Sequence, residues 1–193
     1  MKTVQPIKDE KKITAMRKIL YAQNLRDYAW FTLGINSGLR ISDILNLTFN
    51  DVLNKNKVKT AIELHEKKTG KLKAFPLGKK TIDALKEYIH SCGAYELEQP
   101  LFYSKKTKDG AKAPISRQHA HYVISECAKA VGIEESIGTH TLRKTFGYMA
   151  YKKGIDITRI QKLLNHDSPA TTLSYIGITK EELDDIYINM ELG

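Results

Sequence analysis

Residues 138–151, GTHTLRKTFGYMAY, place a histidine and an arginine three positions apart at the start of a segment with helical character. Residues three apart lie on one face of a helix, so His140 and Arg143 can contact the same ligand. Taken alone, the pair is a weak signal, because a histidine at a helix start and a surface arginine account for most such pairs. Its meaning depends on what the rest of the chain supplies.

The 193-residue chain carries an excess of basic side chains, with 31 Lys and Arg against 22 Asp and Glu and a formal charge of +9. This excess favours a polyanionic partner, nucleic acid first, and the alternative is a solvated surface rich in lysine. Hydrophobic residues make up 41% of the chain, which predicts an ordinary folded core. The length suits a single domain.

The two cysteines and the N-terminus indicate a cellular compartment. Cys92 and Cys127 lie far apart without a CxxC motif, so we expect reduced thiols and neither a disulfide nor a zinc site. The N-terminus has no apolar run typical of a signal peptide, and no stretch is long enough to span a membrane. The sequence therefore predicts a soluble, cytoplasmic protein.

The hydrophobic periodicity predicts a mainly α-helical domain with a small antiparallel β-sheet, an α+β fold. The first dozen residues are polar and expected to be frayed. Asp27, Ser116, Thr139 and Ser168 are the expected N-caps of their helices, and a further helix is expected directly after Asp156. Tyr148 and Tyr151 are expected to be packing groups. A hairpin with a basic tip is expected around KKTG (67–70), and SKKTKDGAKAP (104–114) reads as an exposed basic loop. Helices are predicted from Thr14 onward, after Asp27, after Arg40, and over 79–92, 116–131, 139–153, 156–165, 168–176 and 181–192.

Four residues elsewhere in the chain have the chemistry that would give His140 and Arg143 a role. Arg40 starts a helix behind a glycine, Lys68 is at the hairpin tip, His166 ends a helix, and Tyr175 follows a Ser-Pro-capped turn. A phosphodiester in transfer carries charge that arginine forks hold well. Tyrosine becomes a useful nucleophile when cations favour its phenolate or a base takes its proton. No carboxylate cluster typical of a magnesium site is seen, so the set indicates metal-free attack on phosphorus by a tyrosine.

In this order the residues resemble the motif of the tyrosine recombinases, the family of phage lambda integrase and Cre recombinase. That motif is an arginine, a lysine in a β-hairpin, His-x-x-Arg, a histidine or tryptophan, and a nucleophilic tyrosine. The resemblance runs from about Thr14 to the C-terminus and implies the tyrosine recombinase catalytic-domain fold. It implies no metal or nucleotide cofactor, and it implies these catalytic residues: Arg40, Lys68, His140, Arg143, His166 and Tyr175.

Three positions leave alternatives open. The family often has a glutamate three residues after its first arginine, and Asp43 stands there, either supporting the arginines or facing the core. Lys68 is favoured by analogy with the family's hairpins over its neighbours Lys67, Lys71 and Lys73. Asn165 occupies a place where the family frequently has glycine. Lys144 is expected to meet a neighbouring phosphate or solvent.

The resemblance implies site-specific cleavage and rejoining of double-stranded DNA through a 3′-phosphotyrosine. It implies a homotetramer on DNA, compatible with a monomer in solution and with accessory DNA-bending proteins. We divide the chain into a flexible segment over 1–12, a catalytic domain over 13–180 and a C-terminal helix over 181–193. The apolar face of that helix suits docking on a neighbouring subunit or on its own core.

Two rival functions share much of this motif. One is relaxation of DNA by a type IB topoisomerase, and the other is a non-catalytic DNA-binding regulator on the same fold. Family members usually carry a separate helical domain before the catalytic one. The chain is therefore expected to be either a separated catalytic domain or a short form similar to the fimbrial-switch invertases.

Overall fold

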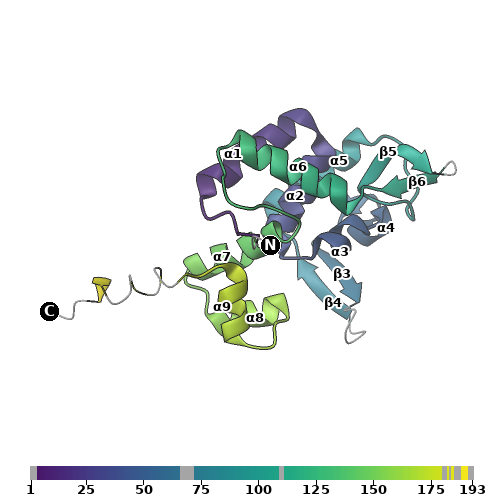
Figure 1. The fold of residues 1–193 in the computed structure, drawn as a ribbon. Coiled ribbons are helices and arrows are strands. Elements are labelled where there is room, and N and C mark those ends of the chain that lie inside the picture. Colours follow the sequence, from purple (N-terminus) through teal and green to yellow (C-terminus); the bar gives the residue numbers. More distant parts are fainter. Residues whose placement is uncertain are drawn as a thin grey trace.

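The computed structural model describes residues 4–65, 72–108, 111–179, 182, 184 and 188–190. This part of the chain is mostly helical with small antiparallel hairpins, as the sequence predicts (Figure 1). Its elements are α1 (Glu10–Gln23), α2 (Leu25–Ser37), α3 (Ile41–Leu45), α4 (Phe49–Val52), β1 (Leu53–Asn54), β2 (Lys57–Val58), β3 (Ala61–His65), β4 (Leu72–Pro76), α5 (Lys79–Ser91), β5 (Tyr103–Lys108), β6 (Ala111–Pro114), α6 (Arg117–Ala130), α7 (Thr141–Lys152), α8 (Ile157–Leu164) and α9 (Pro169–Ile176).

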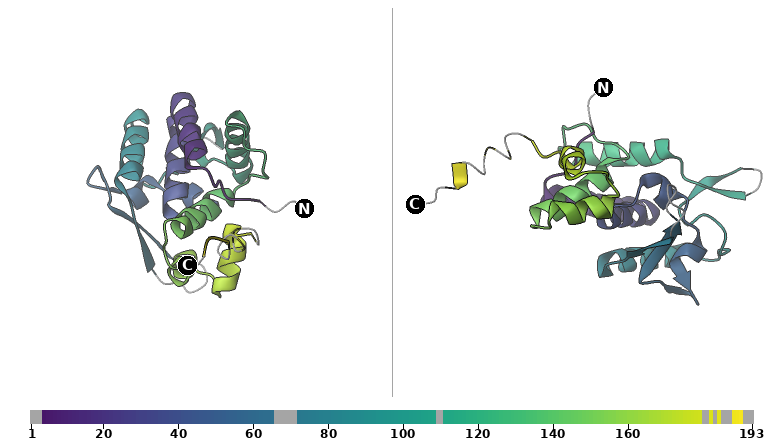
Figure 2. Two further views of the ribbon diagram at one scale, coloured as in Figure 1. Left: turned by 90° about the vertical axis from the view of Figure 1, so that its left-hand side faces the viewer. Right: turned by 90° about the horizontal axis from the view of Figure 1, so that it is seen from below.

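Helix α2 is the centre of the main hydrophobic core. It packs against α1, α5 and α7, and α5 and α6 lie on opposite sides of the α1–α2 pair (Figure 2, left). Trp30 and Phe31 are fully buried, and the indole of Trp30 donates to Asp27 Oδ1 at 2.9 Å. The prediction that Asp27 caps this helix is wrong, because its carboxylate turns inward to Trp30 and Arg26. Asn24 caps the helix instead.

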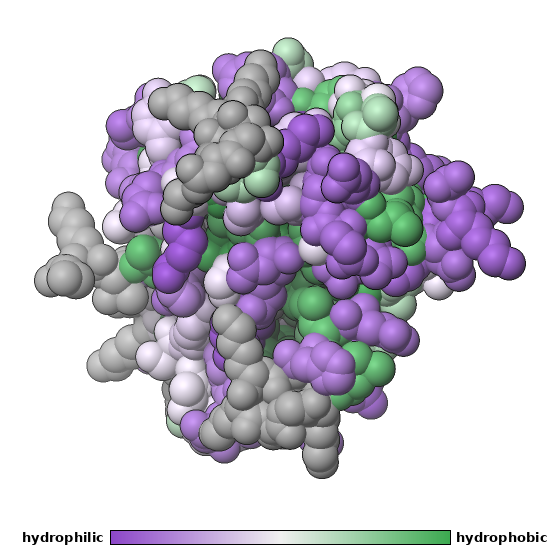
Figure 3. All heavy atoms as spheres, turned by 90° about the vertical axis from the view of Figure 1, so that its right-hand side faces the viewer, coloured by the Kyte–Doolittle hydropathy of each residue, from purple (hydrophilic) through white to green (hydrophobic). Residues whose placement is uncertain are grey.

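The predicted hairpin around KKTG is confirmed in its described strands, where β3 pairs antiparallel with β4 from Ala61 opposite Pro76 to His65 opposite Leu72. A second hairpin, β5–β6, stands where the sequence was expected to form an exposed loop. That expectation is wrong, because backbone pairing forms strands there although the segment is lysine-rich and lacks apolar alternation. Hydrophilic residues cover most of the molecule's face on this side (Figure 3).

Helices α7, α8 and α9 enclose a second, smaller hydrophobic cluster of Tyr148, Ile160, Leu164 and Ile176. These helices form one group beside the larger part of the domain (Figure 1). Close packing here depends on Gly147, where an added Cβ would lie 2.6 Å from Ile176 Cγ2. We call this group the nucleophile unit, because it carries Tyr175, the predicted nucleophile.

The first residues of the described chain are packed, although a frayed segment is predicted there. Ile7 is only 2% exposed and donates its backbone N–H to Thr145 Oγ1 at 2.9 Å. The Gln5 N–H donates to the Ser136 carbonyl, and the Gln5 carbonyl accepts from Thr141 Oγ1. Residues 4–8, the N-terminal strap, therefore hold the start of α7, because backbone polar groups satisfy each other there.

The predicted C-terminal helix lies largely outside the described residues, which include neither Leu183, Ile186 nor Tyr187. Of its described side chains, Ile188 and Met190 are 68% and 63% exposed. In the described part of the chain, no helix has the length and apolar character needed to cross a bilayer.

Candidate active site

The turn between α2 and α3 presents the first arginine. Gly38 ends α2 with φ +65°, a conformation that L side chains rarely adopt, and an added Cβ would lie 2.5 Å from the Phe146 ring. Arg40 follows as the exposed residue at the start of α3, as the sequence predicts. The chain therefore turns sharply enough to place this guanidinium at the mouth of a pocket.

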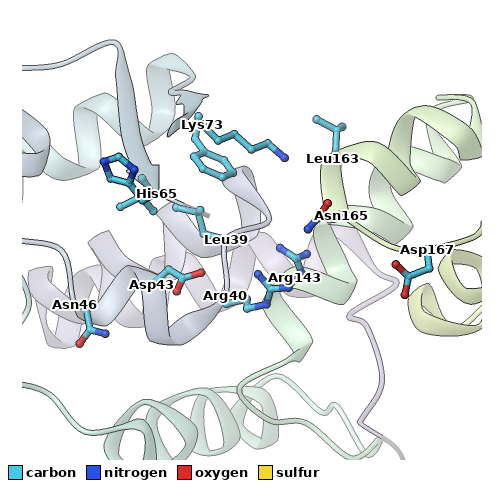
Figure 4. Close-up of a pocket in the computed structure, with 12 residues that line it drawn as sticks. Leu39, Arg40, Asp43, Asn46, His65, Lys73, Arg143, Leu163, Asn165 and Asp167 are labelled. Atoms are coloured by element: carbon cyan, nitrogen blue, oxygen red, sulfur yellow. The ribbon is translucent and has the colours of Figure 1, made fainter. Parts of the chain in front are cut away.

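That pocket has a volume of about 450 Å³ and lies between the β3–β4 hairpin, α3 and the end of α8. Arg40 and Arg143 lie side by side in it, with Asp43 on their α3 side (Figure 4). Burial lowers the pKa of Arg143, and the negative charge of Asp43 partly opposes that shift. Asp43 thus lies where it can support the arginines, which is one of its two predicted roles.

Arg143 connects the two packing regions. It is 7% exposed, and its guanidinium donates to the Gly38 carbonyl on one side and to the Leu164 carbonyl on the other. The hydroxyl of Tyr175 lies near the same guanidinium and influences its pKa. Because two backbone carbonyls fix its planar fork, Arg143 is held in one orientation before any ligand binds.

Two capped helices place His166 and Tyr175. The Asp156 side chain caps α8 and Ser168 caps α9, with Pro169 at the first helical position, as predicted. Asn165 ends α8 with φ +49°, where glycine is the usual residue. His166 then meets Tyr175 edge to face, with 4.7 Å between the ring centroids.

The hydrogen bonds of His166 indicate which ring nitrogen carries the proton. Thr172 Oγ1 donates its only proton to the Ser168 carbonyl, 3.0 Å away, so it accepts from His166 Nδ1 at 3.2 Å. Burial, with Arg143 and Arg40 nearby, lowers the pKa of His166 and favours the neutral ring. Neutral His166 therefore keeps its proton on Nδ1 and offers Nε2 as an acceptor.

His140 is the residue preceding α7, and its backbone carbonyl accepts from the Lys144 N–H. The structure has His140 at the position where the sequence predicted Thr139 as the cap. Desolvation lowers the pKa of His140, and Arg117, Lys144 and the two site arginines lower it further. His140 is therefore close to the cationic centre and is most stable as a neutral imidazole that can accept a proton.

Tyr175 is held as a neutral phenol. Burial raises its pKa above the usual value, while Arg143, Arg40 and the hydrogen bond from Arg143 pull it down. Tyr175, His140 and His166 do not line the 450 Å³ pocket; they adjoin it through Arg143. An anionic ligand bound by Arg143 would therefore lie near the phenol hydroxyl.

Lys68 lies outside the described residues, together with Lys67 and Lys71. The described hairpin instead brings Lys73 and His65 to the pocket, and Figure 4 shows both on the hairpin side, with Arg40 and Asp43 on the α3 side. Sequence reasoning gave neither a primary role, although strand alternation could have found Lys73. It pairs with Leu64 and lies two positions from Phe75, and all three line the pocket.

Lys144 differs from its prediction. The sequence predicts contact with a phosphate or with solvent, but this side chain is 7% exposed and lies over the Tyr175 ring, 5.0 Å from its centroid.

Tyr148, which was expected to pack, lies in the second hydrophobic cluster. Among the described residues, no group of three or more His, Cys, Asp or Glu side chains is placed to hold a metal ion.

Comparison with known proteins gives a consistent result. The model of the Phage integrase family matches residues 8–182. The chain is 43% identical to the probable integrase/recombinase YoeC of Bacillus subtilis, covering 94% of this chain and 93% of that one. It is 31% identical to the tyrosine recombinase XerC of Thermodesulfovibrio yellowstonii, covering 84% of this chain and only 53% of that one. The crystal structure of XerA recombinase has the same fold, with a TM-score of 0.75, 22% identity, and coverage of 97% and 63% of the two chains.

Proposed function

The chain belongs to the phage integrase family, and on that premise we propose that it is a site-specific tyrosine recombinase acting on double-stranded DNA. The observation that carries the proposal is the position of Arg143, which faces the pocket beside Arg40 and lies near enough to Tyr175 to lower the pKa of its hydroxyl. A phosphodiester bound by these two guanidinium groups would lie within reach of that hydroxyl. Bidentate arginine contacts suit a phosphate, and an excess of positive charge suits the rest of the DNA backbone.

The proposed step is a transesterification without net change in bond number. Tyr175 Oη forms a bond to phosphorus, and the bond from phosphorus to the 5′ oxygen of the next nucleotide breaks. The phenol proton passes to a neutral base, for which His140 is our candidate, and the 5′ oxygen takes a proton from a lysine. Arg40, Arg143 and His166 would hold the phosphate, the last of these when protonated near the bound anion. The reverse step rejoins a 5′ hydroxyl to the 3′-phosphotyrosine.

The proton donor to the leaving oxygen is proposed to be Lys68, with Lys73 as its competitor. A DNA substrate with sulfur in place of the bridging 5′ oxygen needs no such proton, because a thiolate is a good leaving group. We expect Lys68→Ala to lose about 100-fold or more in cleavage of ordinary DNA and to recover most of it on the sulfur substrate. If Lys73→Ala instead loses cleavage of ordinary DNA and recovers it on the sulfur substrate, the proton donor is Lys73.

The proposed assembly on DNA is a homotetramer that exchanges strands through a Holliday junction. The chain spans about half the length of the XerC relative, so a complete reaction is proposed only for the chain with whatever further domain or partner it uses. Residues 181–193 are the proposed docking segment between subunits, and accessory DNA-bending proteins are compatible with this assembly.

The function is tested by covalent capture. Nicked duplexes with randomised flanks, labelled at either end, are incubated in chelator with wild type and with Tyr175→Phe. The proposal predicts an SDS-resistant adduct on the 3′-phosphate side with wild type only, and sequencing of the adducts reveals the target. An adduct on the 5′ side, or an equal yield from Tyr175→Phe, would overturn it. Relaxation of supercoiled plasmid without strand exchange would point to topoisomerase activity instead.

A further inference from the structure

Lys144 is a buried cation for which the described structure offers no acidic partner. Its side chain is 7% exposed, and burial lowers its pKa, because an ammonium loses hydration inside the protein. Lysine is rarely buried to this extent unless it is paired. Within the described residues no carboxylate lies within ion-pair distance of Lys144, in contrast to Lys8, which pairs with Glu182. An arrangement that weakens the fold in this way calls for a functional reason.

The described contact of its ammonium is with the proposed nucleophile. Nζ of Lys144 lies 5.0 Å from the centroid of the Tyr175 ring, within the range of a cation–π contact. His166 packs edge to face with the same ring. Arg143, one residue earlier on α7, lies near the hydroxyl and lowers its pKa. Consecutive residues of one helix therefore place one cation at the face of the ring and another near its oxygen.

We propose that Lys144 is a positioning residue for Tyr175: its ammonium holds the ring by its face and favours the phenolate that attacks phosphorus. This inference rests on the proposed function. When the phenol ionises, negative charge spreads from the oxygen into the ring, so a cation over the face gains more from the phenolate than from the phenol. When DNA takes Arg143 away from the hydroxyl, Lys144 stays in place, because it contacts the ring and not the oxygen.

A purely structural role predicts a different outcome. If Lys144 only filled space, an apolar side chain of similar length would fill it as well and would avoid burying a charge. Lys144→Met should then leave the ionisation of Tyr175 unchanged. If the ammonium acts on Tyr175, the same variant should have equal or greater stability to urea and a less acidic phenol, which is a trade of function against stability.

The test compares Lys144→Met, Lys144→Arg and the control Lys152→Met. Lys152 lies on the same helix but is exposed at its far end, so its variant removes one charge without touching Tyr175. Tyrosine labelled with ¹³C at Cζ is titrated by NMR in the absence of DNA, and Tyr175→Phe identifies the signal. The charged and titratable groups that face this tyrosine are Arg40, Arg143, Lys144 and the neutral His166.

We expect Lys144→Met to raise the titration midpoint of Tyr175, and Lys144→Arg and Lys152→Met to shift it much less. The pH profile of covalent capture should move to higher pH by a similar amount. An unchanged midpoint in Lys144→Met would overturn the inference, and Lys144→Gln is used if the methionine variant does not fold. Because the titration needs no DNA, it judges Lys144 even if wild type forms no adduct and the proposed function fails.

Discussion

The large core around α2 and the nucleophile unit differ in how firmly they hold their parts of the site. The large core buries Trp30, Phe31 and many aliphatic side chains, and Arg40 lies at its edge. The nucleophile unit buries only Tyr148, Ile160, Leu164 and Ile176 among the described residues, and it carries His166 and Tyr175. Regions with little buried apolar surface open at lower free energy than the whole fold. Arg40 is therefore expected to be held rigidly, and the unit that carries Tyr175 is expected to be able to move.

Three features join the two regions. Helix α7 contributes Leu142 to the large core and Tyr148 to the smaller cluster. Arg143 donates to a carbonyl in each region. The N-terminal strap adds Lys8, which pairs with Glu182 at 2.9 Å and lies over the Tyr148 ring. Each of these connections can be removed separately.

The largest effect is expected from Arg143→Met. It should lower cleavage by about 100-fold or more, as loss of a donor to a reacting phosphate does. It should also lower the free energy of unfolding by about 2 kcal/mol or more, because two buried carbonyls lose their donor. Arg40→Met should lose comparable activity but change stability by less than about 0.5 kcal/mol, since Arg40 is exposed. Equal stability of the two variants in urea would contradict the connecting role of Arg143.

The next effect sharpens the contrast between the cores. Gly147→Ala puts a methyl group 2.6 Å from Ile176, and Gly34→Ala puts one 2.6 Å from Leu142 Cδ1. Each should cost about 1–3 kcal/mol through overpacking. Hydrogen exchange should rise in α8 and α9 for Gly147→Ala, with DNA binding kept and capture reduced. For Gly34→Ala it should rise across α2 and its neighbours, and a uniform rise in both variants would show that the two regions open together.

The next prediction concerns the stability of the protein at low pH. The pKa values of His140 and His166 are lowered in the folded state, so the unfolded chain binds protons first as pH falls. Stability should therefore be insensitive to these groups above about pH 6.5 and decline as pH drops below it toward their folded pKa values. Urea titrations at pH 5 and 7.5 should show a smaller decline for His166→Gln than for wild type. The exposed His121→Gln controls for losing an imidazole elsewhere, and an unchanged decline in His166→Gln would contradict the prediction.

The smallest effect is expected from the strap. Lys8→Met removes the ion pair to Glu182. Because the side chains of Lys8 and Glu182 are 37% and 31% exposed, the free energy of unfolding should fall by about 1 kcal/mol or less. The effect should shrink in 1 M salt, where charges are screened. Lys79→Met removes an exposed pair with Asp83 in the other region and should change less still. If the strap connects the two regions, amide hydrogen exchange in α9 should be faster in Lys8→Met and unchanged in Lys79→Met.

The sequence predicted those parts of the fold that depend on local chemistry. Ser116, Asp156 and Ser168 cap their helices as predicted, because a side-chain oxygen there accepts from a nearby N–H. The prediction that Asp27 is a cap failed because the buried indole of Trp30, three residues later on the same helix, competes for its carboxylate. The β5–β6 hairpin was not predicted, because its lysine-rich sequence lacks the alternation of apolar and polar residues that is typical of a strand.

The candidate site was predictable as an ordered set of residues but not as a geometry. The order from Arg40 to Tyr175 could be read from motifs. The bonds from Arg143 to Gly38 and Leu164 join residues 105 and 21 positions away, and no local pattern reports them. The position of Lys144 over Tyr175 depends on how α7 packs against α9, and its place next to Arg143 gave no sign of it.

The most direct test of the account is to find which tyrosine carries the DNA. The captured adduct is digested with protease and nuclease, and the phosphonucleotide is located by mass spectrometry among the ten tyrosines of the chain. The account predicts the modification on Tyr175 alone, linked through a 3′ phosphate. Modification of another tyrosine, such as Tyr148 or Tyr151 on α7, would contradict the assignment of the nucleophile and with it the division of the molecule into two functional regions.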